Sequence, residues 1–203
     1  MAEPPTPQSV NADGFDVIII GAGIAGLYQL HQIRQLGLSV HAFEAGSGVG
    51  GTWYWNRYPG ARFDSESFSY GYSFSNEILD EWEWTEHFSP QPETLKYLEF
   101  VADKLDLKRD ITFNTRIVSA TYNPTRNRWS VKTEHGQSVE VHYLITAVGV
   151  LSASYIPEIP GADSFEGRSW HTSHWPKEPV DLSDQRVGVI GTGATAVQLI
   201  TEI

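Results

Sequence analysis

A strand that ends on a glycine-rich turn and continues as a helix constrains the fold of this chain more than any other feature. The β-branched run at 15–20 is followed by the spacing G-x-G-x-x-G at 21–26. Apolar residues then recur at helical spacing over 24–36, and a second apolar run follows at 38–44. The sequence therefore predicts a strand-helix-strand unit, whose two strands are parallel because such crossovers keep one handedness.

The residues of this turn suit the binding of a dinucleotide. Gly21 permits the tight turn, Gly23 lets the backbone approach a pyrophosphate, and Gly26 lets the helix pack closely on the strand. The pyrophosphate would lie at the helix N-terminus, where the N–H groups and the helix dipole stabilise it. Glu44, at the end of the second strand, would accept hydrogen bonds from a ribose and repel a 2′-phosphate. The site therefore fits FAD or NAD rather than NADP, and a purely structural glycine turn is the alternative.

A second strand-turn-helix pattern occurs near the end of the chain. The run at 186–190 precedes Gly191 and Gly193, and Ala196 takes the place of the third glycine. We expect a second nucleotide here, and the residue that distinguishes NADH from NADPH to lie beyond Ile203. One strand and one helix cannot bury a sheet, and the chain stops inside the predicted helix. We therefore expect the N-terminal portion of a longer protein.

Between the two motifs the sequence is less regular. We expect loops and short helices at 65–74 and 76–88, and a proline-rich linker at 156–185. The other predicted elements are a helix at 92–107, a short strand at 111–113, a three-stranded meander formed by 117–122, 128–133 and 137–143, and a buried strand at 143–149.

Composition excludes several classes of function. The 14 Lys and Arg residues are outnumbered by 25 Asp and Glu residues, the net charge is −11, and no basic run is present. An electrostatic hold on nucleic acid or anionic lipid is therefore not expected. The chain has no Cys, and only His171 and His174 have metal-ligand spacing, in a linker without further ligands. We predict no metal, nucleic acid or membrane partner, and a cytoplasmic protein.

Two longer patterns lie between the glycine motifs. The first consists of Gly50, Gly51, Trp53, Tyr58, Pro59, Gly60 and Asp64. The second consists of Phe165, Gly167, His171, Trp175 and Pro176. Both resemble, at every fixed position and in the same order, the signature and the linker fingerprint of the type I Baeyer-Villiger monooxygenases. The resemblance covers 15–203 and is closest to members acting on aryl or cyclic ketones.

Together these features predict an α/β fold with Rossmann-like domains. The expected organisation is a disordered arm at 1–14, an FAD-binding domain with a small β-meander at 15–155, the linker with its fingerprint at 156–185, and the start of an NADP-binding domain at 186–203.

The resemblance also implies site residues. Those implied to contact FAD are Gly21, Gly23, Ala25, Gly26, Glu44, Thr52, Trp53, Tyr54, Trp55, Asp64, Tyr70 and Ile117. Those implied to hold NADP are Arg62, Phe63, Asp64, Gly191, Thr192, Gly193, Ala194, Thr195, Ala196, Val197 and Gln198. The strand end at 146–149 resembles the family's second flavin-contacting turn. His171 and Trp175 of the linker are implied to act through conformation, by coupling domain movement to catalysis.

The implied reaction inserts one oxygen atom of O2 next to a ketone carbonyl, giving an ester or lactone. Family members reduce FAD with NADPH, and the resulting flavin C4a-peroxide attacks the ketone. Aromatic walls exclude water, and an arginine stabilises the developing negative charge. This arginine is expected beyond the end of the chain. The carboxylate matching Asp64 orients the arginine or supports the nicotinamide, so Asp64 is the predicted catalytic residue, with a loop-capping carboxylate as the alternative.

Two other functions stay open. The N- or S-oxygenating flavin-containing monooxygenases share a looser linker pattern but lack the signature from Trp53 to Asp64. The isolated chain is alternatively an FAD-binding module without turnover.

Overall fold

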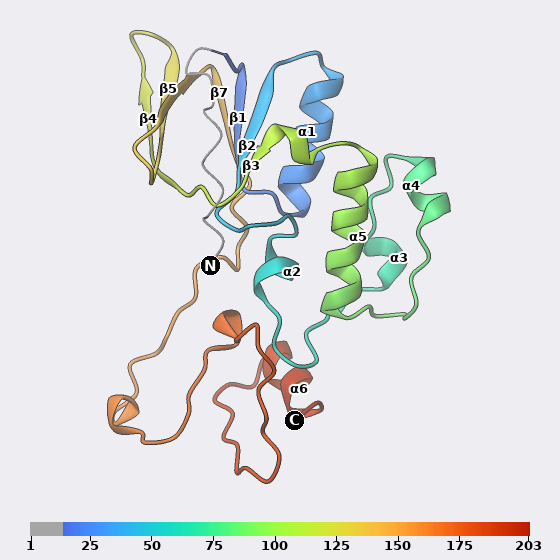
Figure 1. The fold of residues 1–203 in the computed structure, drawn as a ribbon, viewed down its shortest axis with the longest axis vertical. Coiled ribbons are helices and arrows are strands. Elements are labelled where there is room, and N and C mark those ends of the chain that lie inside the picture. The colour runs from blue at the N-terminus through green and yellow to red at the C-terminus, as the bar shows by residue number, and fades with distance from the viewer. Residues whose placement is uncertain (1–13) are drawn as a thin grey trace, which may run out of the picture. The chain divides into compact units, whose positions relative to one another are not determined.

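The computed structural model describes residues 14–203 (Figure 1). The predicted N-terminal arm at 1–14 lies outside the described residues except for Gly14. The chain divides into two compact units. Unit 1 consists of the residues up to Gly51 together with Leu98–Val150, and unit 2 consists of Thr52–Tyr97 together with Leu151–Ile203.

Unit 1 is built on a parallel sheet of four strands. They are β1 (Val17–Ile20), β2 (Val40–Phe43), β3 (Ile111–Thr112) and β7 (Tyr143–Thr146). Their order is β3-β2-β1-β7, and Val17 of β1 pairs with Val40 on one side and with Tyr143 on the other. The parallel pairing predicted for the first two strands is confirmed. β1 and β2 are buried almost throughout, which explains their continuous apolar sequences.

The helix α1 (Ile24–Gln35) joins β1 to β2, as predicted (Figure 1). Its side chains Leu27 and Leu30 are buried, so it is held by apolar packing. The helix ends at Gln35, Leu36 is its C-cap, and Gly37 has a φ of +74°. This left-handed conformation is typical of a glycine just after a helix.

The predicted meander forms a separate antiparallel sheet. Its strands are β4 (Ile117–Asn123), β5 (Arg128–Thr133) and β6 (Ser138–Val141), in that order. Val131, Val139 and Val141 of the meander form one buried cluster with Ile18 and Phe43 of the parallel sheet. The two sheets of unit 1 therefore share a core. The predicted helix at 92–107 is observed as α5 (Gln91–Lys104), followed by a short 3-10 helix η1 (Lys108–Asp110).

Unit 2 contains short helices and loops. The helices are α2 (Thr52–Trp55), α3 (Ser67–Tyr70), α4 (Asn76–Glu81), η2 (Ala162–Ser164), η3 (Thr172–His174) and α6 (Ala194–Ile200). In the part of the chain that the structure describes, no helix is long and apolar enough to cross a membrane.

The strand predicted at 186–190 was wrong. These residues form no strand, and Val187 and Ile190 are exposed. A strand forms only where a neighbouring strand accepts and donates its backbone hydrogen bonds, and none of the named strands belongs to unit 2. The helix after the second glycine motif is formed, but it ends at Ile200 instead of continuing through the last residue.

A histidine is buried in the sheet of unit 1. His41 on β2 is 9% exposed, and its Nε2 lies 2.7 Å from Oγ1 of Thr112 on β3. Its ring stacks on Phe15 and meets Phe43 edge-on. Burial lowers the pKa of His41 below its ordinary value of 6.5, and the charge of Asp110 opposes this shift only in part. The folded protein therefore favours the neutral form of His41 more than the unfolded chain does.

We predict that His41 makes unit 1 less stable in acid. Below pH 6.5 the unfolded chain protonates His41 while the folded chain resists, so the free energy of unfolding falls as the pH is lowered through this value. The substitution His41→Gln keeps a polar group near Thr112 and removes the titration. The free energies of unfolding of the two proteins can be measured by urea unfolding, followed by circular dichroism, at pH 7.5, 6.5 and 5.5. We expect the free energy of unfolding of the variant to rise relative to that of the wild type as the pH falls. Parallel pH profiles for the two proteins would contradict the assignment.

Candidate nucleotide-binding site

The first glycine motif forms a turn that leaves no space for a side chain at Gly21 or at Gly26. Gly21 follows β1 with a φ of +102°, and a Cβ atom there would lie 2.6 Å from the carbonyl oxygen of Ala147. A Cβ on Gly26 would lie 2.0 Å from the carbonyl oxygen of Gly21. The turn thus lies at the carboxyl ends of the adjacent parallel strands β1 and β7, where open α/β sheets bind their ligands.

A second glycine turn contacts the first. A Cβ on Gly23 would lie 3.2 Å from Cα of Gly51, and a Cβ on Gly51 would lie 2.8 Å from Cα of Gly23. Gly50 N–H also donates to the carbonyl of Ala22 (3.0 Å). Sequence reasoning had placed Gly51 in the signature without seeing this contact. Bare backbone at both turns is the surface that a pyrophosphate needs for close approach.

Glu44 connects the first glycine turn to the loop that follows β2. The residue is 5% exposed, and its carboxylate accepts hydrogen bonds from the backbone N–H of Ala22 (2.8 Å) and of Gly46 (2.7 Å). Each oxygen is therefore engaged by the protein, although each keeps a second lone pair for a hydroxyl. The residue predicted to contact a ribose thus also holds the glycine turn in its conformation.

We predict that Glu44→Gln destabilises unit 1. An amide offers one acceptor oxygen, so its NH2 group would face the N–H of either Ala22 or Gly46 and leave a buried donor unsatisfied. The cost should be about 1–3 kcal/mol in the free energy of unfolding, measured by urea denaturation. Glu134→Gln is a matched control, because Glu134 accepts a similar hydrogen bond from Arg116 N–H at an exposed site. Equal losses in the free energy of unfolding for the two substitutions would show that the buried hydrogen bonds of Glu44 stabilise the protein no more than an exposed one.

The start of α1 is suited to an anion. Its N-cap, Gly23, is extended, no side chain caps the helix, and its first turn has no acidic residue. Ala25 in this turn is exposed. The helix dipole therefore faces a surface made of backbone, which is the arrangement that binds phosphates. Ile117, the other FAD residue predicted in unit 1, begins β4 and packs against the buried cluster.

The aromatic residues of the signature form a cluster in unit 2. Trp53 is buried, and its Nε1 donates to the hydroxyl of Tyr70 (2.6 Å). Phe63 stacks on Tyr70, with ring centroids 4.3 Å apart, and meets Trp53 edge-on. Burial raises the pKa of Tyr70, and the hydrogen bond from Trp53 opposes this only in part. Tyr70 therefore keeps its proton at neutral pH, and the cluster is uncharged.

The rest of this loop is more open. Thr52 begins α2, and its carbonyl accepts a hydrogen bond from Asn56 N–H. Tyr54 is partly buried, and its ring contacts Trp55 edge-on. Lys177 of the linker places its Nζ 6.0 Å from the centre of the Tyr54 ring. The linker and the aromatic signature therefore meet at Tyr54 within unit 2.

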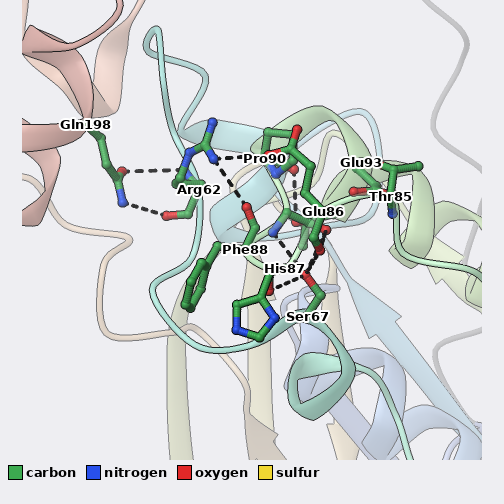
Figure 2. Close-up of polar contacts among 11 residues, drawn as sticks. Arg62, Ser67, Thr85, Glu86, His87, Phe88, Pro90, Glu93 and Gln198 are labelled. Atoms are coloured by element: carbon green, nitrogen blue, oxygen red, sulfur yellow. Dashed lines mark hydrogen bonds and ion pairs between the residues drawn. The ribbon is translucent and has the colours of Figure 1, made fainter.

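Arg62 is held by a polar network (Figure 2). Its Nη1 lies 3.2 Å from Glu86 Oε2 and donates to the carbonyl of Phe88 (3.4 Å), and its backbone pairs with Pro90. Ser67 supports this network, because its hydroxyl lies 2.6 Å from the carbonyl of Glu86. Sequence reasoning missed both Glu86 and Ser67, which sit in a stretch without any motif. In the structure Ser67 is buried between exposed neighbours, and the sequence carries no signal of this burial.

Asp64 lies beside this network but takes no part in it. The side chain is exposed, and in residues 14–203 its carboxylate makes no hydrogen bond or ion pair. The alternative role as a loop cap therefore has no support in the structure. A carboxylate left in this state is available to a cation or to a bound molecule.

The second glycine motif is exposed where it precedes α6. Gly191 has a φ of +127°, Gly193 is the extended N-cap of α6, and a Cβ on either would meet open space. The exposed members of the predicted set are Gly191, Thr192, Gly193, Ala194 and Val197, while Thr195 and Gln198 are partly buried and Ala196 is buried. Gln198 differs from the others because its side chain is hydrogen-bonded to Tyr58 and Arg62.

The linker fingerprint is ordered by local contacts. His171 Nδ1 accepts a hydrogen bond from Ser173 N–H (3.2 Å), which places the ring proton on Nε2. Trp175 and Trp170 lie with ring centroids 5.7 Å apart. The side chain of Phe165 is exposed and covers Gly167, where a Cβ would lie 2.5 Å from the Phe165 ring, and Pro176 follows Trp175. Within the described residues, no group of three or more His, Cys, Asp or Glu side chains is arranged to hold a metal ion.

Comparisons with known proteins agree with this geometry. Residues 15–203 match the family model described as flavin-binding monooxygenase-like. The chain is 50% identical over 188 residues to an acetone monooxygenase (methyl acetate-forming) of Gordonia sp. strain TY-5, covering 93% of this chain and 35% of the relative. It is 51% identical over 187 residues to a phenazine N-monooxygenase of Lysobacter antibioticus, covering 92% and 34%. The structure of an oxidised steroid monooxygenase bound to NADP is similar with a TM-score of 0.87 and 53% identity, covering 93% and 36%. The chain thus spans about a third of the length of its curated relatives.

Proposed function

The chain belongs to the flavin-binding monooxygenase-like family, and from that premise we propose that it binds FAD at its first glycine motif and NADPH at its second. We further propose that it serves a monooxygenase that inserts one oxygen atom of O2 next to a ketone carbonyl, giving an ester or lactone. One observation carries the assignment of the FAD site: the turn at 21–26 contacts the turn at Gly50–Gly51, and a Cβ on Gly21, Gly26 or Gly51 would lie within 3.0 Å of backbone atoms.

The residues of unit 1 fit the adenosine diphosphate part of FAD. The start of α1 would receive the pyrophosphate, and the free lone pairs of Glu44 would accept ribose hydroxyls. Bound flavin would supply hydride acceptance and oxygen activation, chemistry that protein side chains lack. The domain organisation follows from this assignment, with the FAD-binding domain at 15–155, the linker at 156–185 and the start of the NADP-binding domain at 186–203.

Unit 2, taken by itself, supplies groups of the kind that the proposed chemistry needs. The cluster of Trp53, Phe63 and Tyr70 is uncharged and aromatic, and such a cluster excludes water. The unengaged carboxylate of Asp64 would orient a cationic arginine supplied from outside this chain, which would stabilise negative charge on the reacting oxygen. A small ketone and O2 are the proposed substrates, and the cytoplasm is the proposed location.

A second candidate is oxygenation of a nitrogen atom, which the similarity to a phenazine N-monooxygenase favours. The two reactions are separated by products. We would use a protein of the relatives' full length that carries this chain, called the extended protein, and supply NADPH, O2 and either acetone, cyclohexanone or phenazine. Mass spectrometry should detect an ester or lactone from at least one ketone. Formation of an N-oxide alone would replace the ketone reaction by the second candidate.

Asp64 allows a sharper test. In the extended protein, Asp64→Ala should leave FAD bound but slow flavin reduction or ketone oxygenation by about a hundredfold, because an arginine without its orienting partner is misplaced. Asp80→Ala is the matched control, since Asp80 is another exposed carboxylate of unit 2. Rates are measured by stopped-flow absorbance of the flavin. Unchanged rates in Asp64→Ala would remove this residue from the site.

A further inference from the structure

Gln198 uses its side-chain amide to hold a loop of unit 2. Its Oε1 accepts from the hydroxyl of Tyr58 (2.8 Å) and from the backbone N–H of Arg62 (3.4 Å), and its Nε2 donates to the carbonyl of Arg62 (2.9 Å). Figure 2 shows the amide facing the Arg62 backbone. Both lone pairs of Oε1 and one of the two N–H groups are thus engaged by the protein.

The backbone of α6 also approaches this loop closely. Gly60 has a φ of +77°, and a Cβ there would lie 2.3 Å from the carbonyl oxygen of Gln198. Any other residue at position 60 would separate α6 from the loop or force it into strain. The Tyr-Pro-Gly of the signature therefore provides a hydroxyl for Gln198 and a gap for its backbone.

Arg62 is fixed on its other side as well. Its backbone pairs with Pro90, and its guanidinium, whose side chain is 34% exposed, is held by Glu86 and Phe88. The main chain of Arg62 therefore lies between two anchors, one on α6 and one on the segment before α5. Asp64 follows two residues later, and its side chain has no hydrogen-bond or ion-pair partner among residues 14–203.

We propose that Gln198 is a positioning residue. It ties the helix of the second glycine motif to the segment 62–64, so that the position of this helix sets the position of Arg62 and Asp64. The inference rests on the proposed function, in which the motif holds NADPH and the segment meets its nicotinamide. Gln198 then acts through Arg62 and does not itself bind the coenzyme, although its position in the second glycine motif predicts that it does.

The tie can be tested without any cofactor. Gln198→Leu removes all three hydrogen bonds, and we expect hydrogen exchange of the backbone amides at 58–64 in the purified chain to accelerate by about threefold or more. Thr201→Val is the matched control, because the Thr201 hydroxyl bonds only carbonyls of its own helix. Unchanged exchange in Gln198→Leu, with the wild-type fold retained by circular dichroism, would overturn the tie. Tyr58→Phe removes one bond only and should give a smaller acceleration.

The positioning role is tested by kinetics in the extended protein. Gln198→Glu keeps the size of the side chain but turns a carboxylate oxygen toward the carbonyl of Arg62. We expect flavin reduction at saturating NADPH to slow by about tenfold or more, while the KM for NADPH changes by less than about twofold. Tyr58→Phe should slow reduction in the same direction, and Thr201→Val should not.

The outcomes separate the inference from the proposed function. A raised KM with an unchanged saturated rate would show that Gln198 binds the coenzyme, and unchanged values of both would show that the tie does not position the segment. Either result overturns the proposal. If NADPH does not reduce the flavin of the wild-type extended protein, the proposed function is refuted instead. The hydrogen-exchange experiment would still decide whether Gln198 ties α6 to the segment 62–64.

Discussion

A buried carboxylate is the interaction on which the candidate site depends. Glu44 accepts hydrogen bonds from Ala22 N–H in the first glycine turn and from Gly46 N–H in the loop after β2. Gly21 and Gly26 of the first turn have no room for a Cβ. Glu44 therefore holds this turn through its backbone, and a hydrogen bond to a carboxylate in a buried setting is strong.

The chemistry of the chain is divided between its two units. Unit 1 supplies bare backbone and a helix N-terminus. These groups suit the binding of phosphates and take no part in a particular reaction. Unit 2 supplies an uncharged aromatic cluster, a cation paired with Glu86 and the unengaged Asp64. Relatives named for different substrates, acetone and phenazine, match this region over 93% and 92% of the chain. Under the proposed function, the features of the two units would bind and position cofactors, and selection of the substrate is not assigned to them.

Most of the fold was predictable because it rests on local patterns. The β1-α1-β2 unit and the meander each carry their own hydrophobic period and turn residues. The strand expected at 186–190 failed because a strand also needs neighbours, which no local pattern supplies. The bonds of Gln198 to Tyr58 and Arg62 were equally hidden, since these residues are far apart in sequence. Gly60 was the one hint in the sequence, because a glycine is needed there to make room for the backbone of Gln198.

The assignment of the first glycine motif to FAD is tested most directly by titrating the purified chain with FAD. The titration is followed by visible absorption and by quenching of the tryptophan fluorescence. We predict saturation at one FAD per chain, with a flavin spectrum shifted and better resolved than that of free FAD. We also predict that Gly26→Ala, which would place a Cβ 2.0 Å from the Gly21 carbonyl oxygen, abolishes the change, whereas Gly14→Ala, where a Cβ meets open space, does not. A spectrum identical to that of free FAD, or equal binding by the Gly26→Ala variant, would contradict the assignment of the glycine turns as the flavin nucleotide site.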